Sequence, residues 1–213
     1  MHPLPPHDLV KGAIEAVIAA GSFASRRGWI PATSGNFSVR VDAGHVALTR
    51  SGADKGALSQ EDVLIQPLRE SLLPNSSAEA LLHLDIYEDD PLVGAVFHIH
   101  SRAAALISRA HLEAGFVRLT GWELQKAFAG VRTHEAAIDI PIFVNDQNIP
   151  ELAVRIAEHR AMSRNSNRLT SPGYLISSHG LYAWGQNSRE AMRHLEAFDA
   201  LLELLLLEGA YQP

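Results

Sequence analysis

Cysteine is absent from all 213 residues, which excludes both a disulfide framework and a thiolate metal site. A long apolar run is also lacking, since the leucines at 204–207 are far too few to cross a bilayer. Residues 1–7 carry prolines and no apolar core of the kind that a signal peptide needs. We therefore expect a soluble cytoplasmic protein with no membrane partner.

An excess of positive charge is likewise missing. The chain has 18 Lys and Arg against 24 Asp and Glu, which gives a formal net charge of -6 at pH 7. Because no basic stripe runs along any segment, we expect no nucleic-acid partner. The hydrophobic share of 46% and the charged share of 20% are ordinary for a globular protein. No repeat, linker or low-complexity segment divides the chain, so we predict one domain over residues 1–213.

Hydrophobic periodicity predicts an α/β fold, in which helices and short strands alternate without a regular βαβ pattern. Asp8 and Ser77 are the expected N-caps of two helices. The predicted helices cover residues 8–27, 77–88, 101–109, 121–128, 151–162 and 188–207, and the predicted strands 37–41, 45–49, 63–66, 94–100, 116–119, 137–140, 174–178 and 181–184, with a loop at 141–150 and a polar break at 165–171. We expect a three-layer α/β/α domain with a mixed, largely antiparallel central sheet. Leucines on most faces of the last helix suggest a subunit contact.

Histidine is the one residue type in excess, with 11 copies. His98 and His100 end a predicted buried strand, where side chains two residues apart point to the same face. His179 ends a second such strand, and three imidazoles with one open position are typical of a catalytic zinc site. Local hydrogen bonding is the alternative for each. The other candidate ligands are His83, His111, His134, His159 and His194, among which His134, beside Glu135, is the strongest rival.

Two carboxylates could move protons at such a site. Glu79 and Glu123 each lie early in a predicted helix. The simpler interpretation of both is an acid placed at a helix N-terminus by the helix dipole. Either would serve as an acid or base if it lay near the metal, because burial can tune the pKa of a carboxyl group.

Two glycine-bearing loops offer hydroxyls, an amide and backbone N–H groups of the kind that bind phosphate. Ser77 could join them, and Lys55 adds a positive charge nearby. The candidate phosphate ligands are Thr33, Gly35, Asn36, Ser51, Gly52 and Ser77. Each loop alone is only a turn.

Five segments together resemble the class II aldolase family of zinc enzymes, in the order of that family and over nearly the whole chain. They are residues 32–36, 49–52, 77–79, 98–101 and 179–185. The resemblance implies one zinc ion per subunit held by His98, His100 and His179, a phosphorylated ketose as substrate, and a homotetramer with active sites at subunit contacts. The chain departs from the family at Ala78, where aldolases often carry a second phosphate-binding serine.

Five further segments resemble the dehydratases of that family. They are residues 28–36, 51–56, 121–127, 133–135 and 140–150. Glu123 matches the acid/base of the dehydratases, whereas Glu79 matches the catalytic carboxylate of the aldolases. The resemblance therefore implies dehydration of a 1-phosphorylated methylthio-ketose, with sugar-phosphate cleavage or pentulose-phosphate 4-epimerisation as the alternative reactions. A non-catalytic scaffold is a third hypothesis, which the retained histidines and carboxylates disfavour.

Overall fold

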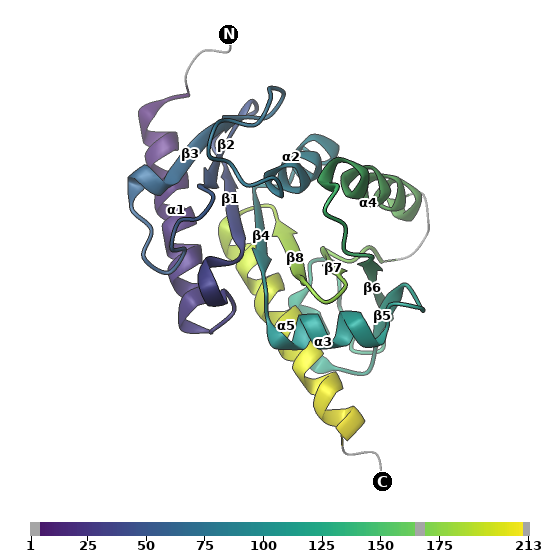
Figure 1. The fold of residues 1–213 in the computed structure, drawn as a ribbon. Coiled ribbons are helices and arrows are strands. Elements are labelled where there is room, and N and C mark those ends of the chain that lie inside the picture. The colour runs from purple at the N-terminus through teal and green to yellow at the C-terminus, as the bar shows by residue number, and fades with distance from the viewer. Residues whose placement is uncertain (1–4, 165–168, 211–213) are drawn as a thin grey trace.

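An eight-stranded sheet runs through the fold (Figure 1). The computed structural model describes residues 5–164 and 169–210. In chain order the strands are β1 (Asn36–Arg40), β2 (His45–Thr49), β3 (Val63–Pro67), β4 (Ala95–Ile99), β5 (Phe116–Leu119), β6 (Ile138–Phe143), β7 (Gly173–Ile176) and β8 (Gly180–Gly185). They lie side by side in the order β3-β2-β1-β4-β8-β7-β6-β5. Only the β6–β7 pair of this sheet is parallel, so the predicted mixed, largely antiparallel sheet is confirmed.

Helices cover both faces of the sheet, as predicted (Figure 1). One face packs against α1 (His7–Arg26), α3 (Arg102–Ala110) and α5 (Ser188–Ala210), and the other against α2 (Ala80–Asp89) and α4 (Ile149–Arg164). Alternate residues of a strand supply the two cores. Phe97 packs with the α1/α3/α5 side and Val96 with the α2/α4 side. His98, which shares the parity of Val96, therefore faces the side of α2.

Most short elements lie where the sequence places them, and the hairpin of β1 and β2 is present. The turn 60–62 (Gln60–Asp62) opens with a capping box of Ser59 and Asp62. The predicted helix at 121–128 is a 3-10 helix, η3 (Glu123–Ala127). A further 3-10 turn, η1 (Pro31–Thr33), lies in the first glycine loop.

Three boundary predictions are wrong. Asp8 lies inside α1 rather than capping it, and the helix begins after Pro6. Glu79, not Ser77, is the N-cap residue of α2, although the Ser77 hydroxyl accepts a hydrogen bond from the Glu79 N–H at 3.3 Å. Part of the predicted polar break, residues 165–168, lies outside the described residues.

The third error is the loop predicted from residue 141. Strand β6 continues through Pro141, which lies opposite Phe116 of the edge strand β5. Proline removes one donor from the ladder, but pairing resumes at once because the Ile142 N–H donates to the Gly115 carbonyl at 2.8 Å. Pro150 then occupies the first turn of α4, where a missing N–H costs nothing.

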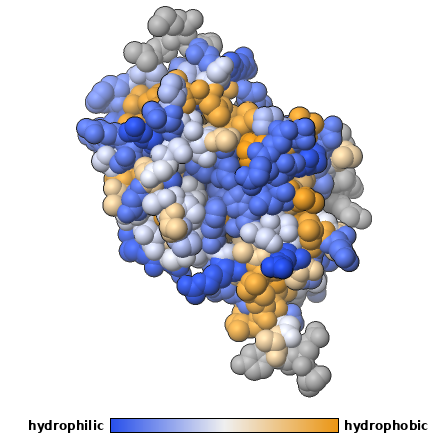
Figure 2. Space-filling model, in the orientation of Figure 1, coloured by the Kyte–Doolittle hydropathy of each residue, from blue (hydrophilic) through white to orange (hydrophobic). Residues whose placement is uncertain are grey.

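The C-terminal end of α5 extends beyond the sheet (Figure 1). An apolar surface covers this projecting end in the space-filling view (Figure 2). Leu207, near the end of α5, is 56% exposed. Leu204, Leu205 and Leu206 are only partly buried. In the described part of the chain no helix combines the length and the apolar character that crossing a membrane requires.

Candidate metal centre and its pocket

The middle pair of strands brings three histidines together. His98 lies in β4, His100 follows that strand, and His179 precedes β8, which pairs with β4 in the antiparallel sense. Gly180 permits this close approach, because a Cβ there would lie 2.2 Å from the Ile99 carbonyl oxygen and 2.8 Å from His98 Cε1. The glycine next to His179 is therefore required by packing against the neighbouring strand.

Ser178 shapes the turn that carries His179. Its φ of 56° lies in the left-handed region, which serine seldom occupies. The Ser178 N–H donates to the hydroxyl of Ser108, a buried residue of α3, at 3.1 Å. This bond between α3 and the turn fixes the backbone on which His179 stands.

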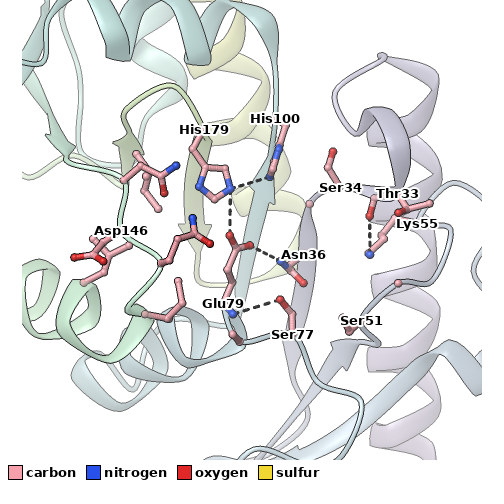
Figure 3. A pocket seen from close by; sticks show the side chains of 18 residues that line it. Thr33, Ser34, Asn36, Ser51, Lys55, Ser77, Glu79, His100, Asp146 and His179 are labelled. Atoms are coloured by element: carbon pink, nitrogen blue, oxygen red, sulfur yellow. Dashed lines mark hydrogen bonds and ion pairs between the residues drawn. The ribbon is translucent and has the colours of Figure 1, made fainter.

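The side chains of His98, His100, His179 and Glu79 converge at the ends of β4 and β8. Figure 3 shows three of them, His100, His179 and Glu79. The Nε2 atom of His100 lies 2.9 Å from that of His98 and 3.1 Å from that of His179. The Glu79 carboxylate lies 3.1 Å from His179 Nε2 and 3.6 Å from His98 Nε2. A tetrahedral ion would hold two nitrogen ligands roughly 3.3–3.4 Å apart. The residues thus fit one divalent cation, with ligand atoms all within 4.8 Å of one another.

His98 and His100 are held neutral, as metal ligands must be. Burial, reinforced by the neighbouring imidazoles, lowers the pKa of His98 well below its usual value, and burial lowers the pKa of His100 to about 4. His98 Nδ1 hydrogen-bonds to the Leu181 carbonyl at 3.1 Å, which leaves the Nε2 lone pair for a metal. The Tyr182 ring stacks on His98 at 4.0 Å and fixes its plane.

Glu79 is ionised beside this cluster. Burial raises the pKa of its carboxyl group, but the hydrogen bond with His179 and the electrostatic interactions with the three imidazole rings outweigh burial and lower the pKa to about 2. Asn36 Nδ2 donates to the other side of the carboxylate at 2.9 Å. An oriented, ionised carboxylate here can bind the metal or accept a proton from a bound substrate.

A pocket of about 360 Å³ opens beside the histidines. Every residue predicted to bind phosphate lines it, namely Thr33, Gly35, Asn36, Ser51, Gly52 and Ser77, together with Lys55 (Figure 3). Ser34 and residues 145–147 also line the pocket, although they are not among the predicted phosphate ligands. Residues 145–147 form a polar run directly after the apolar strand at 138–143, and this pattern could have indicated a binding loop.

Glu123 and His134 lie elsewhere in the chain, and neither lines this pocket. The Glu123 side chain is 72% exposed and pairs with Lys126 and, at 3.8 Å, with His134. The buried amide of Gln125 anchors the segment, because it accepts from the Trp122 N–H at 3.0 Å and donates to the Ala136 carbonyl at 2.7 Å. The structure thus presents Glu123 on a rigid, outward-facing support.

The remaining candidate histidines do not join the cluster. His83 is buried and hydrogen-bonds to Ser38 at 2.8 Å. His194 links the Trp184 carbonyl to the Ala129 N–H. His159 packs edge-on against Phe143, and His111 is exposed at the end of α3.

Comparison with known proteins agrees with this architecture. The model of the class II aldolase and adducin N-terminal domain matches residues 15–206. A relative from Bradyrhizobium sp. is 50% identical over 91% of this chain and 90% of its own length. A relative from Parvibaculum lavamentivorans is 50% identical over 92% of this chain and 94% of its own length. Both bear the name methylthioribulose-1-phosphate dehydratase. The chain belongs to the class II aldolase family.

Solved structures show the same fold. The L-fuculose-1-phosphate aldolase of Thermus thermophilus superposes with a TM-score of 0.73 at 25% identity, over 93% of this chain and 96% of its own. A putative aldolase/epimerase/decarboxylase from Klebsiella pneumoniae superposes with a TM-score of 0.78 at 19% identity, over 95% and 92% of the two chains.

Proposed function

We propose that the protein is a metal-dependent lyase that dehydrates 5-methylthioribulose-1-phosphate to 2,3-diketo-5-methylthiopentyl-1-phosphate, a step of methionine salvage. The observation that carries the proposal is the cluster of three imidazoles and a carboxylate at the edge of a pocket lined by hydroxyl and amide groups. The dehydratase name of relatives at 50% identity supports the choice of substrate. The absence of cysteine fits a cytoplasmic enzyme, and the single sheet fits one catalytic domain.

His98, His100 and His179 would hold one zinc ion per subunit. When bound, zinc supplies a Lewis acid for the ketone of the substrate and the hydroxyl beside it. The loops at Thr33 and Ser51 bind the phosphate and so fix carbons 2 to 4 relative to the histidines. Glu79, oriented by Asn36, supports the proton transfer or tunes the metal.

Glu123 performs the acid/base work at carbons 3 and 4. A proton leaves carbon 3, the hydroxyl of carbon 4 leaves as water, and the resulting enol tautomerises to the diketone. Because Glu123 faces outward in its own chain, it acts in the pocket of a neighbouring subunit. The apolar projecting end of α5 is consistent with such an oligomer, which we propose to be a homotetramer.

A sugar-phosphate aldolase or pentulose-phosphate 4-epimerase is the second candidate. The observation in its favour is the position of Glu79, the family's aldolase carboxylate, directly beside the imidazoles. The same metal site would serve cleavage of the bond between carbons 3 and 4.

Assays of the purified, zinc-loaded protein with methylthioribulose-1-phosphate, fuculose-1-phosphate and ribulose-5-phosphate decide between these reactions. We expect a diketone product from the first substrate and no turnover of the others. Cleavage into two fragments without diketone would exclude the dehydratase. Purified protein that holds no divalent ion and turns over none of the three substrates would instead indicate a scaffold.

A further inference from the structure

Lys55 places a buried positive charge in the wall of the pocket. The residue is 3% exposed, and its Nζ donates to the Thr33 carbonyl at 2.8 Å (Figure 3). It is the one lysine or arginine among the described residues that line the pocket. Its hydrogen-bond partner is a neutral carbonyl, whereas the carboxylates of Asp54 and Glu79 act on it through space.

The bend that Lys55 contacts is strained. Ala32 and Thr33 have φ values of 53° and 61°, and a β-branched residue such as threonine is a rare occupant of this left-handed region. Such a conformation costs on the order of 1–3 kcal/mol per residue, so the surroundings must hold it. The hydrogen bond from Lys55 is a contact that does so, and the bend continues through Ser34 and Gly35 into the pocket wall.

The backbone that carries Lys55 is held in place by α1. A Cβ on Gly21 of α1 would lie 2.2 Å from the Lys55 carbonyl oxygen, and one on Gly56 would lie 2.4 Å from Ser25 Oγ. The backbone around Lys55 therefore packs directly on α1. The pocket wall at Thr33 is thus linked to α1 through Lys55, whose backbone packs on Gly21 and whose ammonium group bonds to the wall.

We propose that Lys55 makes this pocket select a phosphorylated substrate, both by locking the bend at residues 32–33 and by supplying the charge that phosphate requires. The inference rests on the proposed function. An ammonium group has three N–H donors, and the Thr33 carbonyl uses one, so two remain for phosphate oxygens.

Binding of inorganic phosphate, measured by calorimetry, tests the proposal without requiring turnover. Lys55→Met should weaken phosphate binding by about 10- to 100-fold in both metal-free and zinc-loaded protein, the loss expected for a charged hydrogen bond. Lys11→Met, at an exposed position on α1, is the matched control and should bind phosphate as the parent does. Phosphate affinity in Lys55→Met within about twofold of the parent would overturn the proposal.

A glycine substitution separates the two parts of the role. Ala32→Gly removes the strain of a positive φ without touching a polar group, so in the Lys55→Met background it should restore thermal stability but not phosphate affinity. Recovery of phosphate affinity in the double variant would show that the charge is dispensable and would contradict the proposal. If Lys55→Met alone does not fold, the comparison is made between Ala32→Gly and the double variant. Loss of dehydratase turnover in a protein that still binds phosphate through Lys55 would count against the proposed function and not against this inference.

Discussion

His98 Nε2 and His100 Nε2 lie 2.9 Å apart at the end of β4. Two neutral imidazoles at this separation present converging lone pairs, and the third, from His179, lies 3.1 Å from His100. The cluster thus has the geometry of a preorganised cation site.

Replacement of His98 by asparagine should abolish tight metal binding and activity together. The side chain is fully buried between Tyr182 and the other imidazoles, so no neighbouring ligand can replace it. We expect zinc affinity to fall by more than about 100-fold, since loss of even a supporting contact to a ligand costs 10- to 100-fold. Metal content measured after dialysis against a weak chelator gives the result. His111→Asn, at an exposed position, is the control, and full zinc occupancy in the His98 variant would remove it from the site.

Replacement of Gly180 by alanine should force β8 away from β4. The new Cβ would lie 2.2 Å from the Ile99 oxygen, which belongs to the backbone and cannot move aside. We expect a loss of about 1–3 kcal/mol in the free energy of unfolding, together with weaker zinc binding. Gly12→Ala in α1 is the control, because its Cβ meets nothing within 4 Å and alanine favours a helix. Equal stability of the two variants, measured by urea denaturation, would contradict the packing argument.

The buried His83 should make stability depend on pH. Burial lowers its pKa from 6.5 to about 4, so between these values the unfolded chain binds a proton that the folded chain does not. The free energy of unfolding must therefore fall as the pH falls through this window, and by roughly 2 kcal/mol between pH 7 and pH 5 from His83 alone. Urea denaturation in the presence of a chelator measures the free energy of unfolding at each pH. Between pH 7 and pH 5 this free energy should fall by roughly 2 kcal/mol less in His83→Gln than in the parent.

Above pH 7 His83 is neutral in both states, so the stability curves of the parent and the variant should run parallel there. The constant difference between the two curves above pH 7 measures any stability that His83→Gln loses through poorer packing. A parallel course down to pH 5 would mean that His83 keeps its ordinary pKa when folded.

Glu123→Gln should lower turnover by about 10²- to 10⁴-fold while metal content and stability stay unchanged. The side chain is 72% exposed, so no core contact is lost. Glu61→Gln, another exposed acid, is the control for a change of charge. A larger loss of turnover in Glu79→Gln would reverse the roles assigned to the two carboxylates.

Mixing two inactive variants tests whether Glu123 acts across a subunit contact. In a mixed oligomer, a Glu123→Gln subunit supplies an intact histidine cluster. A neighbouring His98→Asn subunit supplies an intact Glu123 to that cluster. If the variants exchange subunits at random, about a quarter of the sites should be active. Activity that stays absent after subunits are shown by native mass spectrometry to have exchanged would place Glu123 in its own chain's site.

Local patterns in the sequence predict that the three histidines share one place, and the structure brings them together. The alternation of β4 decides that His98 faces the α2 side, and a glycine after His179 marks a close strand contact. The phosphate loops are predicted for a similar reason, since serine, threonine and glycine in short turns expose hydroxyls and N–H groups.

Contacts between residues that are far apart in the sequence cannot be predicted from local patterns. No local pattern indicates that Ser108 of α3 supports the turn of His179, or that Lys55 reaches the carbonyl of Thr33. Pro141 misleads because a strand near the edge of a sheet tolerates one missing donor, which depends on its neighbour and not on the proline. The outward orientation of Glu123 likewise follows from how Gln125 is buried.

The junction between β4 and β8 has a consequence for synthesis of the protein. The strands on one side of it come from residues 36–99, those on the other from residues 116–185, and 79 positions separate His100 from His179. During synthesis, His98 and His100 therefore leave the ribosome long before His179. A nascent chain that stops short of His179 holds only two of the three histidines, so tight capture of the ion must wait for the segment that also closes the sheet.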